Sequence, residues 1–125
     1  MERDLENSLV ANPQQLEHGL KLYSDNEITG QQLHTGVVGR LDILAIDPNG
    51  NYVVIELKAG KAEDRVCGQI LRYMGWVESE LAPGHQVRGV IVANDFSEAL
   101  KYAAQAMPNV SLKRYEVHFE FTDLE

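Results

Sequence analysis

Two carboxylates and an amine, Asp42, Glu56 and Lys58, are the residues of this 125-residue chain whose types and spacing favour chemistry. Asp42 closes the run Gly-Arg-Leu-Asp, and the run Glu-Leu-Lys begins fourteen positions later. Carboxylate oxygens hold hard divalent cations such as Mg²⁺, which keep water and phosphate oxygens as their remaining ligands. An ammonium group beside such an ion can stabilise the negative charge that builds up when a phosphodiester is attacked. The three residues therefore predict a phosphodiesterase centre that depends on Mg²⁺ or Mn²⁺, as in a nuclease.

The segments that carry these residues are predicted to form a β-hairpin. Residues 41–47 (LDILAID) and 52–58 (YVVIELK) are rich in Ile, Val and Leu, which favour strands. Between them lies Pro48-Asn49-Gly50, in which the proline presets the turn and the glycine supplies the left-handed residue of a three-residue loop. In the resulting register the residue numbers of each cross-strand pair sum to 98, so that Asp42 lies opposite Glu56. Their Cβ atoms are then about 4.5–5.5 Å apart.

The same register places Lys58 on the face of Glu56 and opposite Arg40, because side chains alternate along a strand. Two facing acids at the end of a sheet repel each other and lose hydration, which costs roughly several kcal/mol unless a cation compensates. A divalent metal ion is one such cation. The alternative is a structural ion pair, in which Arg40 or Lys58 neutralises Asp42 or Glu56.

The rest of the chain alternates between helical and strand patterns and predicts one α/β domain over residues 1–125. The hairpin strands are apolar on both faces, which is typical of a central sheet covered on two sides. Asp95 followed by Glu98 is a capping-box signal for the last helix. We therefore expect a sandwich with a central mixed β-sheet flanked by helices. Helices are expected over residues 3–11, briefly from 13, over 61–81 and over 97–107; further strands over 20–29, 87–93 and 110–121; and a polar loop over 30–36.

Three runs of the sequence together resemble a known superfamily. They are Gly-Arg-Leu-Asp at 39–42, Val-Val-Ile-Glu-Leu-Lys at 53–58 and Gly-Gln-Ile-Leu-Arg-Tyr-Met-Gly-Trp-Val at 68–77. In this combination the chain resembles the PD-(D/E)xK nucleases, and most closely the nuclease domain of NucS/EndoMS-type endonucleases. The resemblance covers roughly residues 2–78 and implies a restriction-endonuclease-like fold. The proline of the superfamily's name is replaced here by Leu41. Further matching positions lie near the N-terminus: Leu5-Glu6, Asn12-Pro13 and Leu16-Glu17-x-Gly19-Leu20.

The resemblance implies roles for individual residues. Asp42 and Glu56 would bind the catalytic Mg²⁺ or Mn²⁺, and Lys58 would orient or activate the attacking water. We also expect the main-chain carbonyl of Leu57 to be a metal ligand. The remaining expected roles are a water-mediated metal contact for Glu6, support of the site or a DNA-backbone contact for Gln69, a phosphate contact for Arg40 and a substrate contact for Tyr73.

The net charge of −8 is unusual for a protein that binds nucleic acid, because neutralising phosphates supplies much of the affinity of such proteins. We therefore expect weak, steeply salt-dependent DNA binding, with a partner or a dimer mate supplying further grip. The DNA-binding domain that precedes the nuclease in NucS-type enzymes has no room in these 125 residues. Two alternatives to a DNA endonuclease remain: a non-catalytic module that binds nucleic acid or protein, and an RNA-directed nuclease. A local basic rim is expected from Arg40, Lys58, Lys61, Arg65 and Arg72.

The composition favours a cytoplasmic protein. No apolar run approaches the roughly 18 residues that a membrane span needs, and the first residues are charged rather than signal-like. The lone Cys67 excludes an internal disulfide, as is usual in a reducing compartment.

Overall fold

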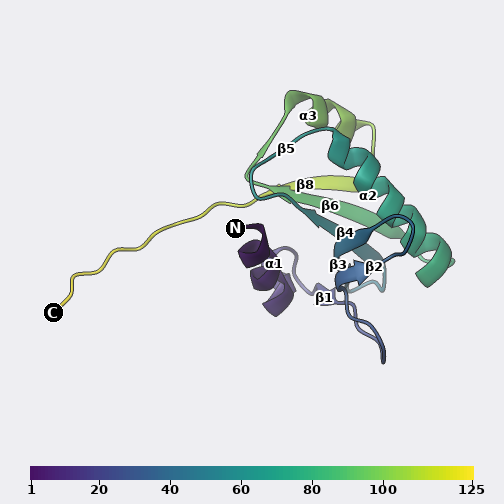
Figure 1. Cartoon of the computed structure of the whole chain (residues 1–125), viewed down its shortest axis with the longest axis horizontal. Coiled ribbons are helices and arrows are strands. Elements are labelled where there is room, and N and C mark those ends of the chain that lie inside the picture. Colours follow the sequence, from purple (N-terminus) through teal and green to yellow (C-terminus); the bar gives the residue numbers. More distant parts are fainter.

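The computed structural model describes all residues 1–125, and its centre is a mixed six-stranded β-sheet (Figure 1). The neighbours follow the order β1-β3-β4-β6-β8, and β2 pairs with β3. Pairing is antiparallel on the β1, β2 and β3 side, and β4, β6 and β8 run parallel. A separate parallel pair joins β5 to β7. The strands are β1 (Lys21–Leu22), β2 (Gln31–His34), β3 (Arg40–Ile46), β4 (Tyr52–Leu57), β5 (Lys61–Ala62), β6 (Val87–Ala93), β7 (Asp95–Phe96) and β8 (Val110–Arg114).

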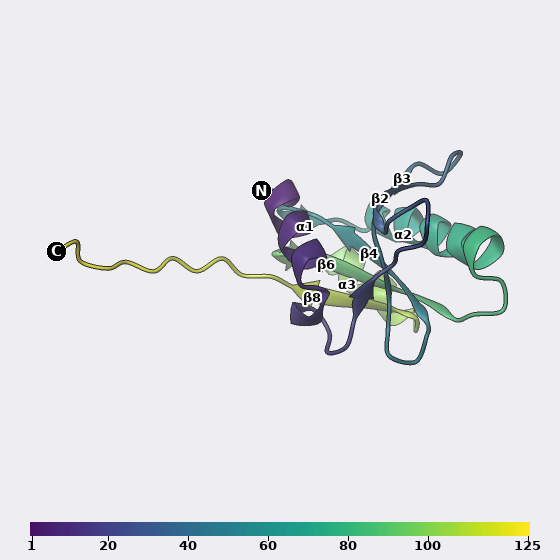
Figure 2. The ribbon, with the colours of Figure 1, turned by 90° about the horizontal axis from the view of Figure 1, so that it is seen from below.

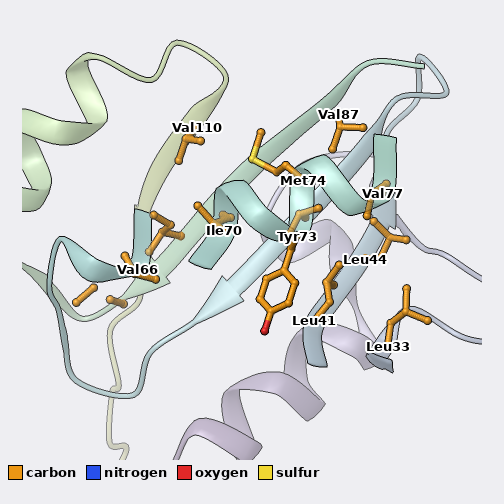
Figure 3. Packing of buried hydrophobic residues seen from close by; sticks show 14 of the residues in the cluster. Leu33, Leu41, Leu44, Val66, Ile70, Tyr73, Met74, Val77, Val87 and Val110 are labelled. Atoms are coloured by element: carbon orange, nitrogen blue, oxygen red, sulfur yellow. The ribbon is translucent and has the colours of Figure 1, made fainter. Parts of the chain in front are cut away.

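Helices cover both faces of this sheet, as the two-sided apolar pattern of the hairpin predicts (Figures 1 and 2). On one face α1 (Glu2–Ala11) contributes Leu9 to a cluster of nine buried apolar residues. On the other face lie α2 (Arg65–Trp76) and α3 (Glu98–Gln105), which contribute to a cluster of 17 (Figure 3). A 3₁₀ turn, η1 (Pro13–Gln15), follows α1, and a π-helical turn, η2 (Val77–Leu81), continues α2. None of the helices combines the length and apolar character required to cross a membrane.

The predicted hairpin register is confirmed. The cross-strand pairs run from Ile46 with Tyr52 to Ile43 with Ile55, and the residue numbers of each pair sum to 98. Asp47 N donates to Asn51 O at 2.9 Å, which closes the loop at the expected position. Gly50 has φ +79°, the left-handed conformation that the loop requires.

One expected helix start and one expected helix cap are wrong for the same reason. The helix expected from residue 61 begins at Arg65, because Lys61–Ala62 pairs as β5 with β7. Asp95 belongs to β7 and therefore does not cap the last helix. Ser97 is the N-cap of α3 instead, and its Oγ accepts a hydrogen bond from Leu100 N at 3.1 Å. The β5–β7 pair joins residues that are more than 30 positions apart, which a local pattern does not reveal.

The region before the hairpin also differs from expectation. The strand expected over 20–29 is reduced to β1 and an isolated bridge from Ser24 to Thr29. Asp25 Oδ1 accepts hydrogen bonds from the backbone N–H groups of Glu27 and Ile28, both at 2.8 Å, and this turn interrupts the strand. The polar loop expected over 30–36 contains β2, which pairs antiparallel with β3. Sequence polarity concealed this strand because β2 lies at the margin of the sheet.

The C-terminal strand ends earlier than expected. Its pairing with β6 stops at Ala93 with Arg114, because β6 itself ends there and offers no further backbone partner. Residues 116–125 leave the body of the protein as an extended segment (Figures 1 and 2). The large apolar side chains of this segment are exposed: Val117, Phe119, Phe121 and Leu124.

Candidate active site

The candidate site lies where β3 and β4 stop pairing as regular strands. Hydrogen-bonded pairs alternate along an antiparallel ladder, so the pair of Asp47 with Asn51 predicts a bond from Leu57 N to the Leu41 carbonyl. Leu57 N instead donates to Asp42 Oδ2, at 2.9 Å. The Asp42 carboxylate thus replaces a backbone acceptor at the end of the ladder, and its orientation is fixed by the sheet.

Glu56 is the most perturbed acid of the site. Its side chain is only 2% exposed, and its Oε1 is buried without any hydrogen-bond partner. Burial, followed by the negative charge of Asp42, raises the pKa of Glu56 from the ordinary 4.5 to about 8. Burial also raises the pKa of Asp42, against the opposing effect of the Leu57 hydrogen bond. The two acids are coupled, because the negative charge of Asp42 favours the protonated form of Glu56.

Lys58 and Gln69 lie beside Glu56 on the α2 side. Lys58 Nζ is 3.9 Å from Glu56 Oε2 and donates to Gln69 Oε1 at 3.4 Å. The ammonium group lowers the pKa of Glu56 but only in part offsets the burial. Lys58 therefore stands next to the acidic pair, is held by a helix residue and remains about one third exposed.

Glu6 is connected to the acidic pair through a glutamine. Gln32 Nε2 donates to Glu6 Oε1 and also to Asp42 Oδ1, the latter at 3.3 Å. Gln31 Nε2 donates to the other oxygen of Glu6, Oε2, at 2.8 Å. The structure therefore brings Glu6 close to Asp42, but by way of an amide. The water-mediated metal contact expected for Glu6 stays a prediction.

Arg40 and Tyr73 are placed differently from the central residues. The Arg40 guanidinium contacts His34 Nε2 at 2.7 Å and pairs with neither acid. Tyr73 is 4% exposed, and its ring lies beside Leu41 in the α2-side core (Figure 3). Its hydroxyl is directed towards the β2–β3 turn, where a Cβ added to Gly39 would lie 3.1 Å from it. The ring is thus not free to stack on a base, and the substrate contacts of both residues stay predictions.

These contacts bear on the alternative that Arg40 or Lys58 neutralises Asp42 or Glu56 in a structural ion pair. The Lys58–Glu56 pair lies at the outer limit of an ion pair and leaves Glu56 Oε1 without a partner. Burying an acid in this way is unfavourable unless a proton or a cation compensates. No group of three or more His, Cys, Asp or Glu side chains is arranged to hold a metal ion. Asp42 and Glu56 nevertheless fit a hard dication that takes two carboxylates and completes its shell with backbone, water and substrate oxygens.

Comparison with known proteins shows the family of the chain. Residues 1–118 match the family described as the Endonuclease NucS C-terminal domain. The chain belongs to this family. The NucS C-terminal domain described here is 33% identical over 101 residues to Endonuclease NucS from Pyrococcus abyssi, and equally to that from Pyrococcus horikoshii. Each match covers 80% of this chain but 36% of the relative, so the chain spans about a third of the length of these relatives.

Solved structures agree with the family assignment. The crystal structure of a repair endonuclease from Pyrococcus abyssi matches with a TM-score of 0.77 and 27% identity, over 93% of this chain and 47% of that one. A structure described as an EndoMS-dsDNA2 complex matches with a TM-score of 0.74 over 95% of this chain and 46% of that one. At 24% identity, the second match shows a shared fold. The mixed α/β architecture is therefore that of NucS structures.

Two residues of this NucS C-terminal domain escaped the sequence reasoning. Glu2 Oε2 accepts a hydrogen bond from Ala59 N at 3.2 Å, and its charge raises the pKa of both Asp42 and Glu56. Gln32 bridges Glu6 and Asp42 with φ +50°, a left-handed conformation that costs about 1–3 kcal/mol for a residue other than glycine. The β2–β3 register, in which residue numbers sum to 74, would have placed Gln32 next to Asp42. The first helix was expected to begin one residue after Glu2.

Proposed function

We propose that this domain is the catalytic part of a divalent-metal-dependent DNA endonuclease of the PD-(D/E)xK type, with a restriction-endonuclease-like sandwich fold. The observation that carries the proposal is the buried, unpartnered Oε1 of Glu56, next to a second acid and within 3.9 Å of a lysine ammonium. The names of the relatives, Endonuclease NucS, support hydrolysis of nucleic acid. The DNA-bound EndoMS structure supports DNA as the substrate class.

In this proposal Asp42, Glu56 and the main-chain carbonyl of Leu57 hold one or two Mg²⁺ or Mn²⁺ ions. A bound dication of this kind polarises the scissile phosphate and lowers the pKa of a nearby water. Lys58 positions the water for in-line attack and stabilises the developing negative charge. Gln69 holds the Lys58 ammonium, and Gln32 holds Asp42.

The remaining residues act at the edges of the site. Glu6 would contact the metal through a water molecule. Its carboxylate is held in place by hydrogen bonds from the side-chain amides of Gln31 and Gln32. Arg40 would contact a substrate phosphate. The buried Tyr73 would act through its hydroxyl. Because the net charge of −8 leaves little positive charge to neutralise phosphates, we propose that a partner or a second copy of the chain contributes part of the DNA affinity.

The test is to incubate the purified chain with labelled single-stranded, branched and mismatched DNA, and with RNA of the same sequences, and to measure cleavage of each. We expect DNA cleavage in Mg²⁺ or Mn²⁺ that stops when EDTA is added, and that persists in the control variant Lys101→Ala. Lys101 is exposed on α3 and pairs only with its neighbour Glu98. Cleavage of RNA alone would replace the proposed substrate. A folded protein that cleaves none of these substrates would be the non-catalytic module.

A further inference from the structure

A basic cavity lies beside the candidate active site, along the first turns of α2. It has a volume of about 410 Å³ and is lined by four cationic side chains, Lys58, Lys61, Arg65 and Arg72, together with Gln69 and a single acid, Glu63. Four of the chain's 11 Lys and Arg residues thus face one hollow, in a protein whose net charge is −8. This concentration of positive charge contrasts with the acidic character of the chain as a whole.

Three of the four cations of this cavity have no ion-pair partner within the protein. Lys61, Arg65 and Arg72 form no ion pair within 4.0 Å, whereas Arg88, elsewhere in the fold, is held by Glu17 at 2.6 Å and by Asp47 at 3.3 Å. Like charges that share a hollow repel each other, and an anionic ligand relieves the repulsion. The site is therefore built for an anion, and its opening to solvent leaves these three side chains exposed.

The position of the cavity ties it to the acidic pair. Lys58 and Gln69 line the cavity, and Lys58 Nζ is also 3.9 Å from Glu56 Oε2. A second hollow, of about 270 Å³, adjoins Asp42 through Gln32, and two acids offset two bases there: Glu2, Glu6, Arg3 and Arg40. The expected basic rim is therefore split, and Arg40 belongs to the other hollow. Positive charge accumulates on one side of the acidic pair only.

The polar character of the lining also indicates which kind of anion the cavity binds. Only two of its eight residues are apolar, Ala62 and Val66, whereas pockets for small organic ligands are lined mostly by apolar and aromatic groups. No aromatic side chain lines the cavity, so a base has no ring on which to stack. Lysine and arginine side chains on an open surface suit phosphates that follow one another along a strand, which such contacts hold without reading sequence.

We infer that this cavity binds the backbone phosphates of a nucleic-acid strand on one side of the scissile bond. The inference rests on the proposed function, because it gives the strand its place relative to Asp42 and Glu56. A cavity of this kind also lets an acidic domain bind a polyanion, because only a short stretch of the nucleic-acid backbone contacts the protein. Binding is accordingly independent of sequence and depends strongly on salt concentration.

The test compares two triple variants with the same change of charge. Lys61→Gln, Arg65→Gln and Arg72→Gln are combined in one protein, and Lys21→Gln, Lys101→Gln and Lys113→Gln in the control; each set removes three charges, from −8 to −11. Binding of a labelled single-stranded oligodeoxynucleotide is measured in EDTA across a salt series, with an abasic oligonucleotide of equal length as a second ligand. Circular dichroism spectra of each triple variant, compared with those of the corresponding single variants and the wild type, check that the fold is kept.

For the cavity variant we expect the slope of log Kobs against log salt to fall by about 2, since each phosphate contact on a single strand contributes roughly 0.7. We also expect affinity at low salt to fall at least tenfold, and the abasic strand to bind the wild type with an unchanged slope. An unchanged slope in the cavity variant, an equal loss in the control, no binding by the wild type, or loss of binding to the abasic strand would each overturn the inference. Because the measurement contains no metal and scores no cleavage, it fails separately from the proposed function.

Discussion

Lys58→Ala is expected to lower the rate of metal-dependent DNA cleavage by about 10²–10³-fold, as removal of a single group that stabilises charge in the transition state does in other enzymes. The ammonium group lies 3.9 Å from Glu56 Oε2 and 3.4 Å from Gln69 Oε1, so its removal takes one charge from the site and breaks one side-chain hydrogen bond. The protein should remain folded, because the side chain is about one third exposed.

The experiment is single-turnover cleavage by the wild type, Lys58→Ala and Lys58→Met at saturating Mn²⁺. The methionine variant keeps the length of the side chain without its charge, and both variants should lose the same activity if the charge is what matters. Saturating metal is needed because Lys58 lowers the pKa of Glu56, so its loss strengthens proton competition at that carboxylate. Cleavage rates within about threefold of the wild-type rate in either variant would show that Lys58 has no catalytic role.

Glu56→Gln is expected to stabilise the metal-free protein by several kcal/mol at pH 8.5. The folded protein holds a proton on Glu56 up to a pKa of about 8, whereas the unfolded chain loses it near 4.5. Between these values the folded state binds more protons, so stability falls as pH rises, by at most about 1.4 kcal/mol per pH unit from this group. Below about pH 4.5 both states are protonated and the effect vanishes. Glutamine stays neutral throughout and removes the decline.

Urea denaturation in EDTA at pH 6 and pH 8.5 measures this difference. The wild type should lose stability between the two values, and Glu56→Gln should lose much less, because the group with a pKa of about 8 is gone. Glu17→Gln is a useful comparison, because Arg88 lowers the pKa of Glu17 and its replacement should destabilise the protein at both pH values. Parallel pH profiles for wild type and Glu56→Gln would show that Glu56 is not held in the uncharged form.

The sequence predicts the central hairpin well because its determinants are local. The strand pattern, the Pro-Asn-Gly loop and the two-residue period of a strand fix the register, and the structure confirms the pairs from Ile43–Ile55 to Ile46–Tyr52. The helix over α1 is likewise recovered to within one residue at its start, and β6 at both of its ends. In each case the information lies within one continuous segment of the chain.

The parts that could not be predicted depend on contacts between distant segments. β5 forms a strand only because β7 lies beside it. This pairing places Asp95 in a strand rather than at the helix cap where it was expected, and α2 begins at Arg65 rather than at residue 61. The bridge from Gln32 to Glu6 and Asp42 depends on a left-handed residue within a short strand that looks like a polar loop. Glu2 reaches Ala59 across 57 positions of sequence. Tyr73 lies in a run of sequence that resembles the superfamily, but only the fold shows that its ring is buried.

The central claim is that Asp42 and Glu56 together hold a divalent cation in place of the proton that Glu56 otherwise keeps. Calorimetric titration of Mn²⁺ into wild type and Asp42→Asn at pH 7, in two buffers of different ionisation enthalpy, tests it most directly. Asparagine can still accept the hydrogen bond from Leu57 N, which makes this variant a fair comparison. We predict Mn²⁺ binding to the wild type with release of roughly one proton, because metal ligands must be deprotonated, and loss of that binding in Asp42→Asn. Equal binding by the two proteins, or none by the wild type, would contradict the account.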